Sequence, residues 1–295
     1  MHVPVLLQET IEWLKPKVGG IYIDCTVNRA GHAVKVAEAI GGKGILIIFD
    51  LDNVALQEAK KILESLSNAP KIIAVNANFR TLKEVLTTHN ITHIDGLIAD
   101  LGLSSQELDS SKRGFSFRFD EPLLMTFIDK VDESTLTAKD IVNDWKEENL
   151  ADIIYGFADE KYSRRIAQAI VREREVKPIE TTFQLVDIIG SAVPANYRHG
   201  KTHYATKTFQ ALRMAVNDEL GSIKELISLL PEVLNVESRA CIITFHSTED
   251  RTVKNLIRDT EGLNLVSKKA IMPSDIETKS NPRSRSAQLR IAERI

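Results

Sequence analysis

Cysteine and long apolar runs are scarce in this sequence, and each scarcity excludes a class of protein. Only two cysteines occur among the 295 residues, Cys25 and Cys241, and both lie in apolar, strand-like runs. Because they show no metal-ligand spacing, a disulfide-stapled scaffold and a cysteine metal centre are excluded, and we expect two buried free thiols. No apolar stretch reaches the roughly 18 residues that a membrane-spanning helix requires.

Two further absences concern location and partners. Residues 1–5, MHVPV, contain no basic segment followed by an apolar one, so no signal peptide is expected. Together with the unpaired cysteines, this predicts a cytoplasmic protein with no membrane partner. The 38 Lys and Arg residues are outnumbered by 41 Asp and Glu residues, and the net charge is −3. Any contact with nucleic acid must therefore use local basic patches.

Short apolar runs alternate with helical patterns through the first hundred residues. The apolar runs predict four strands, over 21–24, 45–50, 72–75 and 94–100. Strands that alternate with helices of about 10–15 residues are typical of a parallel sheet in a doubly wound α/β domain. Continuous apolar strands also suit a sheet that is covered on both faces.

The alternation stops near residue 108 and returns with a long helix predicted over 206–230. Strands are predicted after it at 241–245 and 288–292. The residues between hold no convincing strand, but an irregular loop over 109–129 and helical patterns around 138–145, 162–175 and 182–192. We therefore predict an α/β domain formed by residues 1–108 and 206–295, with an inserted helical domain over 109–205.

Three aspartates end predicted strands, and these are the first candidates for a site. Asp24, Asp50 and Asp100 would lie at the carboxyl ends of their strands, where open α/β sheets bind ligands. A carboxylate at the position of Asp50 commonly accepts two ribose hydroxyls of a nucleotide-like cofactor. The turn over 26–32 is poor in glycine, so it favours neither a pyrophosphate cofactor nor S-adenosylmethionine. Any one of these aspartates could instead cap a helix.

The predicted helix over 162–175 has one apolar and one basic face. Lys161, Arg165 and Arg172 share the face opposite Ile166 and Ile170. A basic stripe of this kind is either a solvated surface or a surface that contacts phosphates.

Six stretches together give the sequence a recognisable pattern. They are DGLIADLGLSS (95–105), RGFSF (113–117), RRIAQAIV (164–171), ATKTFQALR (205–213), FHSTEDR (245–251) and NPRSRS (281–286). In this order they resemble the bacterial 16S ribosomal RNA (cytosine-N4)-methyltransferase family, also called the RsmH or MraW family. The resemblance extends over nearly the whole chain.

The resemblance implies a Rossmann-like class I methyltransferase sheet that depends on S-adenosylmethionine, with the inserted helical domain recognising the substrate. The implied reaction methylates the exocyclic N4 of a cytidine in the P site of 16S rRNA, with the small ribosomal subunit as partner; a homodimer is also compatible. Asp100 would face the reaction centre and serve catalysis. The implied cofactor contacts are Ala30, Gly31, His32, Asp50, Phe79, Asp100 and Glu107.

The implied chemistry leaves several roles open. The target base must leave its stack to be methylated. Phe115, Phe117 and Phe119 could hold such a base or could be core anchors. His32 and His246 are interpreted as orienting hydrogen-bond partners rather than bases. The spacing of Ser247 and Asp250, which follow His246 directly, fits a helix cap.

The sequence departs from the family pattern at the turn and at the presumed active-site loop. Asn28 and Ala30 stand where the family has glycines, and either can block the ligand or require an unfavourable positive φ. Other departures are Glu107 for glutamine, Leu124, Thr126 and Ile128 for charged residues, Tyr204 for proline and Thr248 for leucine. We therefore weigh an active methyltransferase against a catalytically impaired relative that keeps the fold and RNA binding. A nicotinamide enzyme would need a fuller glycine fingerprint.

Overall fold

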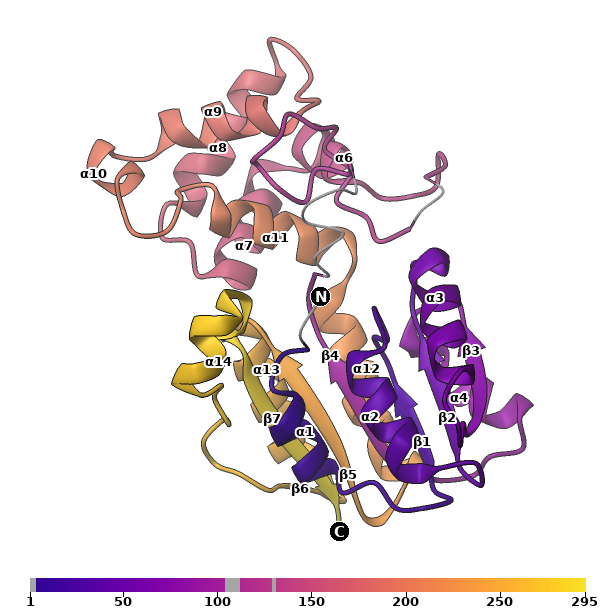
Figure 1. Ribbon diagram of the computed structural model, residues 1–295. Coiled ribbons are helices and arrows are strands. Elements are labelled where there is room, and N and C mark those ends of the chain that lie inside the picture. Colours follow the sequence, from indigo (N-terminus) through magenta and orange to yellow (C-terminus); the bar gives the residue numbers. More distant parts are fainter. Residues whose placement is uncertain (1–3, 104–111, 129–130) are drawn as a thin grey trace. The chain divides into compact units, whose positions relative to one another are not determined.

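The computed structural model describes residues 4–103, 112–128 and 131–295 of the chain (Figure 1). It divides into two compact units, one formed by Met1–Gly102 with Leu220–Ile295 and the other by Leu103–Glu219. We call them the sheet unit and the helical unit. The insertion predicted over 109–205 falls inside the helical unit, which is longer at both ends.

The sheet unit contains a seven-stranded sheet in the order β3-β2-β1-β4-β5-β7-β6. Neighbouring strands from β3 to β5 run parallel, whereas β7 runs antiparallel to both β5 and β6. The strands are β1 (Ile21–Asp24), β2 (Ile45–Phe49), β3 (Lys71–Val75), β4 (Ile94–Asp100), β5 (Leu234–Thr244), β6 (Leu263–Leu265) and β7 (Gln288–Arg294).

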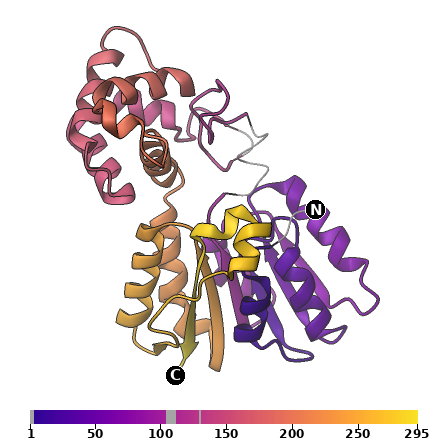
Figure 2. The same ribbon diagram turned by 60° about the vertical axis from the view of Figure 1, so that its left-hand side comes forward.

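Helices cover both faces of this sheet, as Figure 2 shows. Successive strand residues point to opposite faces, so Ile47 and Leu97 belong to one hydrophobic cluster and Ile48 and Ile98 to another. The first cluster is closed by α4 (Leu82–Thr88), α12 (Glu219–Val233) and α13 (Ser247–Asp259), and the second by α1 (Leu7–Leu14), α2 (Gly31–Ile40) and α3 (Asn53–Glu64). Shorter helices are η1 (Phe79–Thr81), α14 (Asp275–Ser280) and η2 (Pro282–Ser286).

All six predicted strands are confirmed, but β5 is longer than predicted and β6 is missed. The first half of β5, LNVESRA, contains four polar residues and only three apolar ones, so it gives no apolar strand signal. Only Leu263 is buried within the three residues of β6. Such a short edge strand is below the length at which periodicity is informative.

The helical unit consists of helices packed around its own apolar core. The helices are α6 (Ala138–Asp144), α7 (Glu147–Ala158), α8 (Ser163–Arg174), α9 (Thr182–Ala192), α10 (Ala195–Arg198) and α11 (Thr206–Val216). The patterns at 138–145, 162–175 and 182–192 are thus confirmed, and α7 is missed. On α8, Ile166 and Ile170 are buried while Arg165 and Arg172 are exposed, as the two-faced pattern predicts, and Lys161 is exposed just before the helix.

The single helix predicted over 206–230 is wrong, because the chain breaks between α11 and α12. Asp218 has a positive φ of 44°, which ends the helical path. The Asn217 side chain instead donates to the carbonyl of Met125 at 2.7 Å and accepts from the N–H of Phe127 at 2.8 Å. A partner some 90 residues away in the chain therefore causes the break.

Cys25 and Cys241 are buried free thiols, as predicted. Within the described ranges, no helix is both long and apolar enough to cross a membrane. The same residues contain no group of three or more His, Cys, Asp or Glu side chains arranged to hold a metal ion.

Candidate active site

Asp24, Asp50 and Asp100 meet at one edge of the sheet. Strands β2, β1 and β4 are direct neighbours, and these aspartates end or immediately follow them. Because the three strands are parallel, their carboxyl ends open at the same edge. The convergence predicted from the strand pattern is therefore present.

A network of hydrogen bonds ties the three strand ends together. The Oδ1 of Asp24 accepts from the N–H of Thr26 at 3.1 Å, and the Thr26 hydroxyl accepts from the N–H of Asp100 at 2.7 Å. The Oδ2 of Asp50 accepts from the N–H of Asn28 at 2.9 Å, and its Oδ1 from the N–H of Asp52 at 2.9 Å. Thr26 thus fixes β1 against β4, a role the sequence pattern did not reveal.

The strand-end carboxyls lie in an environment that disfavours negative charge. Burial raises the pKa of Asp24 to about 7, against the opposing hydrogen bond from Thr26. Burial likewise raises the pKa of Asp50 to about 6, although backbone N–H groups of Asp52, Asn28 and Leu51 stabilise its charged form. Burial, followed by repulsion from Asp24 and Glu249, raises the pKa of Asp100 to about 8. Perturbed groups gathered in one place are typical of functional sites.

Asp100 is the least satisfied of these carboxyls. Its Oδ1 atom is buried and has no hydrogen-bond partner among the described residues. Glu249, on the first turn of α13, is fully buried, and its Oε2 accepts from the N–H of Phe245 at 2.9 Å. The sequence analysis interprets this segment only as a helix cap and does not predict a role for Glu249. Its position just after a predicted strand was a signal that could have identified it.

The helix cap itself differs from the prediction. His246, and not Ser247, is the N-cap of α13, and its Nδ1 accepts from the N–H of Glu249 at 3.3 Å. The Nε2 of His246 lies 2.9 Å from Oε1 of Glu249. Both ring nitrogens of His246 thus face Glu249, and its interpretation as an orienting group stays a prediction.

The turn after β1 adopts the backbone conformation that its non-glycine residues disfavour. Asn28 and Ala30 have φ values of 45° and 60°, in the left-handed region. Ala30 is fully buried in the apolar cluster, and its N–H donates to the carbonyl of Val27 at 2.7 Å. Of the two consequences expected for these substitutions, the unfavourable positive φ is therefore present at both positions.

Gly31 and His32 hold the N-terminal segment against this turn. A Cβ on Gly31 would lie 2.1 Å from Cγ of Pro4, so only glycine permits this approach. The buried His32 places its Nε2 2.9 Å from the carbonyl oxygen of Val5. The N–H of Leu6 donates to Oε1 of Glu277 at 2.8 Å, which adds α14 to the assembly.

Two predicted cofactor contacts, Phe79 and Glu107, lie outside the turn and the strand ends described above. Phe79 is half-buried in η1 after β3 and packs on the apolar cluster that α4, α12 and α13 close. Glu107 lies outside the described residues. Asn76 was not predicted, and its amide donates to the carbonyls of Asp50 and Leu51 at 2.9 and 3.0 Å. It therefore shapes the loop that carries Asp50.

The three phenylalanines of the helical unit occupy different environments. Phe115 is buried and stacks on Phe127, with ring centroids 5.5 Å apart, so it is a core anchor. Phe117 is half-buried and stacks on His203 at 4.4 Å. Phe119 is 53% exposed. Of the three, Phe119 is therefore the most accessible to a base.

The loop in which the sequence departs from its family is ordered by local hydrogen bonds. The hydroxyl of the buried Thr126 accepts from the N–H of Ile128 at 3.2 Å, and Leu124 donates to the carbonyl of Pro122 at 2.9 Å. Ile128 is 48% exposed. The candidate substitute Asp129 lies outside the described residues.

A parallel sheet whose added last strands run antiparallel, with acidic side chains at the carboxyl ends of its central strands, defines a Rossmann-like class I methyltransferase fold. A family model described as the MraW methylase family matches residues 1–295, and the chain belongs to this family.

Two curated relatives that the chain matches over its full length agree with this assignment. The chain is 41% identical over 313 residues to Ribosomal RNA small subunit methyltransferase H of Brevibacillus brevis, covering 100% of the chain and 98% of that protein. It is 44% identical over 313 residues to the protein of the same name from Acetivibrio thermocellus, covering 100% and 99%. A solved rRNA methylase from Streptococcus thermophilus matches with 11% identity and a TM-score of 0.43, over 98% of this chain and 93% of that one.

Proposed function

We propose that the protein transfers a methyl group from S-adenosylmethionine to small-subunit 16S rRNA, at the exocyclic N4 of a cytidine in the P site. Family membership and the names of the full-length relatives support the class of reaction. The observation that carries the proposal is the buried Oδ1 of Asp100, which lacks a partner among the described residues at the carboxyl end of β4. The proposed substrate also implies a cytoplasmic location.

The acidic strand ends suit a cationic cofactor. S-adenosylmethionine carries a sulfonium and an ammonium group, and either charge would relieve the mutual repulsion of Asp24, Asp100 and Glu249. A pyrophosphate would instead add negative charge to these carboxyls. Asp50 uses one hydrogen bond per oxygen on backbone N–H groups, so each oxygen keeps capacity for a ribose hydroxyl.

Each proposed cofactor contact then has a definite part. Asp50 would hold the ribose, Phe79 would pack near the adenine, and Asp100 would accept from the ammonium group. Ala30, Gly31 and His32 would act through the shape of the turn, since Ala30 is fully buried and His32 is turned toward Val5. Glu107 stays a predicted contact.

The chemistry asks the protein to align the amine and to accept its proton. When bound, the cofactor supplies a methyl carbon made strongly electrophilic by the sulfonium. The cytosine N4 lone pair is conjugated into the ring, so the amine becomes nucleophilic as it pyramidalises. With a pKa of about 8, Asp100 is mostly protonated near neutrality when no cation lies beside it. A bound cationic cofactor would favour its charged form, and Asp100 could then accept a hydrogen bond from the amine and take up its proton.

The helical unit would hold the RNA. The exposed side chains of Lys161, Arg165 and Arg172 would contact phosphates, and Phe119 would stack on the extruded base. Aromatic rings orient part of this basic surface, since the Lys161 Nζ lies 5.0 Å from the centroid of the Tyr162 ring. A homodimer stays a prediction.

The decisive experiment is a methyl-transfer assay on undermethylated small ribosomal subunits, followed by nucleoside analysis. We expect one N4-methylcytidine per subunit. Methylation of another base, or of another position on cytosine, would overturn the assigned target. Binding of subunits without any methyl transfer would support the catalytically impaired alternative.

A further inference from the structure

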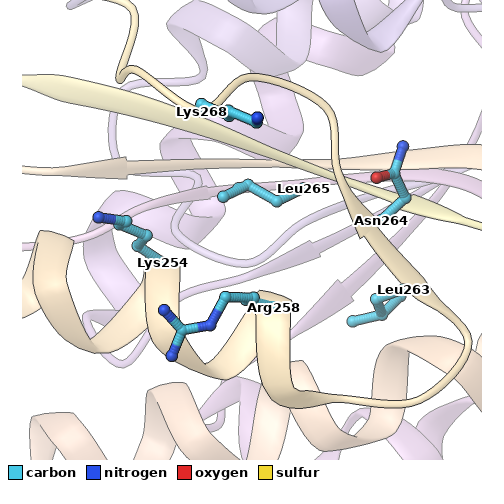
Figure 3. Close-up of a pocket in the computed structure, with 6 residues that line it drawn as sticks. All are labelled: Lys254, Arg258, Leu263, Asn264, Leu265 and Lys268. Atoms are coloured by element: carbon cyan, nitrogen blue, oxygen red, sulfur yellow. The ribbon is translucent and has the colours of Figure 1, made fainter.

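The sheet unit contains a cavity of about 460 Å³ between α13 and the edge strand β6. Figure 3 shows the six residues that line it. Lys254 and Arg258 extend from successive turns of α13, Lys268 comes from the segment after β6, and Leu263 and Leu265 provide apolar surface.

The lining is cationic, and it contains no acidic side chain. Neither Lys254 nor Lys268 forms an ion pair with a described residue, and only Arg258 has a partner, the exposed Asp259, at 2.8 Å. The three cationic side chains give this cavity a local positive charge, although the chain as a whole has a net charge of −3. An anionic ligand is therefore the complementary one.

A buried arginine connects two of the segments that carry the lining residues. Arg290, on β7, binds both oxygens of Asp250 on α13, at 2.6 and 2.8 Å. Its third hydrogen bond goes to the carbonyl of Lys268, at 3.1 Å. One side chain thus fixes the Lys268 backbone relative to α13. The backbone that carries Lys268 is therefore held beside α13 before any ligand arrives.

The cavity lies away from the cofactor site. Lys254 and Arg258 follow the first residue of α13, Ser247, by 7 and 11 positions, which is about 10 and 16 Å along the helix. The α13 N-terminus adjoins the carboxyl end of β5, whereas β6 is three strands from β4 in the sheet order. A ligand here would not occupy the position proposed for S-adenosylmethionine.

We propose that this cavity is an accessory site for the phosphate backbone of the RNA substrate. Two flexible lysines and one arginine supply charge, while Asn264 is the only neutral polar side chain in the lining. Such a set recognises phosphates without reading a base pattern, as backbone contacts do. The inference rests on the proposed function in so far as that function makes RNA the anion.

The test removes two cations and measures RNA binding without the cofactor. The double variant Lys254→Gln/Lys268→Gln removes both charges, keeps polar side chains only one atom shorter, and leaves the Arg258–Asp259 pair intact. We expect about tenfold weaker binding of a small-subunit rRNA fragment by fluorescence anisotropy at low salt. The slope of log Kd against log salt should fall by about 1.5, since each lost phosphate contact removes roughly 0.7–0.9.

The matched control is Lys43→Gln/Lys71→Gln, which removes two exposed lysines from the amino-terminal side of β2 and β3. Equal losses in both variants would mean a general charge effect and would overturn the site. Unchanged RNA affinity in Lys254→Gln/Lys268→Gln would also overturn the site. AMP binding is measured with the same two variants. If Lys254→Gln/Lys268→Gln lost affinity for AMP and not for RNA, the site would belong to a small phosphorylated ligand, and the proposal would be overturned. If the wild-type protein binds the RNA fragment but does not methylate subunits, the proposed function is refuted. The comparison of RNA affinity between the two variants can still be interpreted in that case.

Discussion

Glu160 in the helical unit and Asp100 in the sheet unit are both buried carboxyl groups, but they differ in how far their hydrogen bonds are satisfied. In the helical unit, Glu160 is fully buried and both of its oxygens are used: Oε1 accepts from the N–H of Tyr162 at 2.9 Å, and Oε2 from the hydroxyl of Tyr197 at 2.5 Å. In the sheet unit, Asp100 keeps a buried oxygen that has no partner among the described residues.

The difference separates a structural carboxylate from a functional one. Burial of Tyr197 and its bond to Glu160 raise the pKa of the phenol, which keeps its proton and remains a donor. The hydrogen bonds of Glu160 are therefore satisfied by groups of the protein itself, without a ligand. Asp100, in contrast, carries a desolvation cost that no described group repays, and such a cost is expected where a ligand completes the site.

The largest expected effect comes from Asp100→Asn. If Asp100 accepts from the amine, methyl transfer should fall about 10²- to 10⁴-fold. The same variant should gain about 2 kcal/mol of unfolding free energy at pH 7, because wild-type Asp100 must either bind a proton on folding or bury a charge beside Asp24 and Glu249, and asparagine avoids both. Single-turnover assays and chemical denaturation measure the two effects.

Asp95→Asn is the matched control on the same strand. Asp95 lies near the opposite end of β4, and its oxygens accept from the N–H of Ile21 at 2.8 Å and from the Asn235 amide at 3.0 Å. This variant should lose stability and keep its activity. If both variants lost activity alike, the special role of Asp100 would be refuted.

The pH dependence of stability should sharpen the contrast. A carboxyl with a raised pKa holds its proton only in the folded chain between about pH 4, the unfolded value, and its folded value. For Asp100, with a folded pKa of about 8, this contribution is full below pH 4 and is lost as the pH rises toward 8. Between pH 5 and 7, the unfolding free energy of the wild type should fall more steeply than that of Asp100→Asn, by about 1.4 kcal/mol per pH unit. Parallel pH profiles would contradict the raised pKa.

Glu160→Gln should have the opposite signature in the helical unit. An amide cannot accept two hydrogen bonds from Tyr197 and Tyr162 with both of its terminal atoms, so a buried donor is left unpaired. We expect a loss of about 2 kcal/mol, measured by thermal and chemical unfolding. The affinity for S-adenosylmethionine should stay unchanged by calorimetry. A more stable variant would show that Glu160 also carries an unrelieved cost.

Sequence patterns alone locate the strand ends, because apolar runs that finish in an aspartate mark both the strand and its edge. They therefore find Asp24, Asp50 and Asp100. They do not find Thr26 or Glu249, since those roles depend on hydrogen bonds and charges between neighbouring strands. The break at Asn217 is hidden for the same reason: its partners, Met125 and Phe127, are distant in the chain.

Two glycines extend the comparison to packing. Gly31→Ala would drive a Cβ to 2.1 Å from Cγ of Pro4 and should cost about 2 kcal/mol of stability. Gly156, exposed on α7, has no heavy atom within 4 Å of such a Cβ, so Gly156→Ala should gain about 1 kcal/mol from helix propensity. Denaturant melts decide both. A tolerated Gly31→Ala would mean that residues 4–6 can leave the turn at little cost.

The smallest effect concerns a second unpaired oxygen beside the site. The buried Thr248 hydroxyl has no partner among the described residues, and neither has that of Thr208 in the helical unit. Thr248→Val and Thr208→Val should each gain about 1 kcal/mol, because each removes a desolvated hydroxyl while nearly keeping its volume. Both variants should methylate normally. A loss of activity in Thr248→Val alone would mean that its hydroxyl meets substrate or cofactor, so an unpaired neutral oxygen would mark the site as Asp100 does.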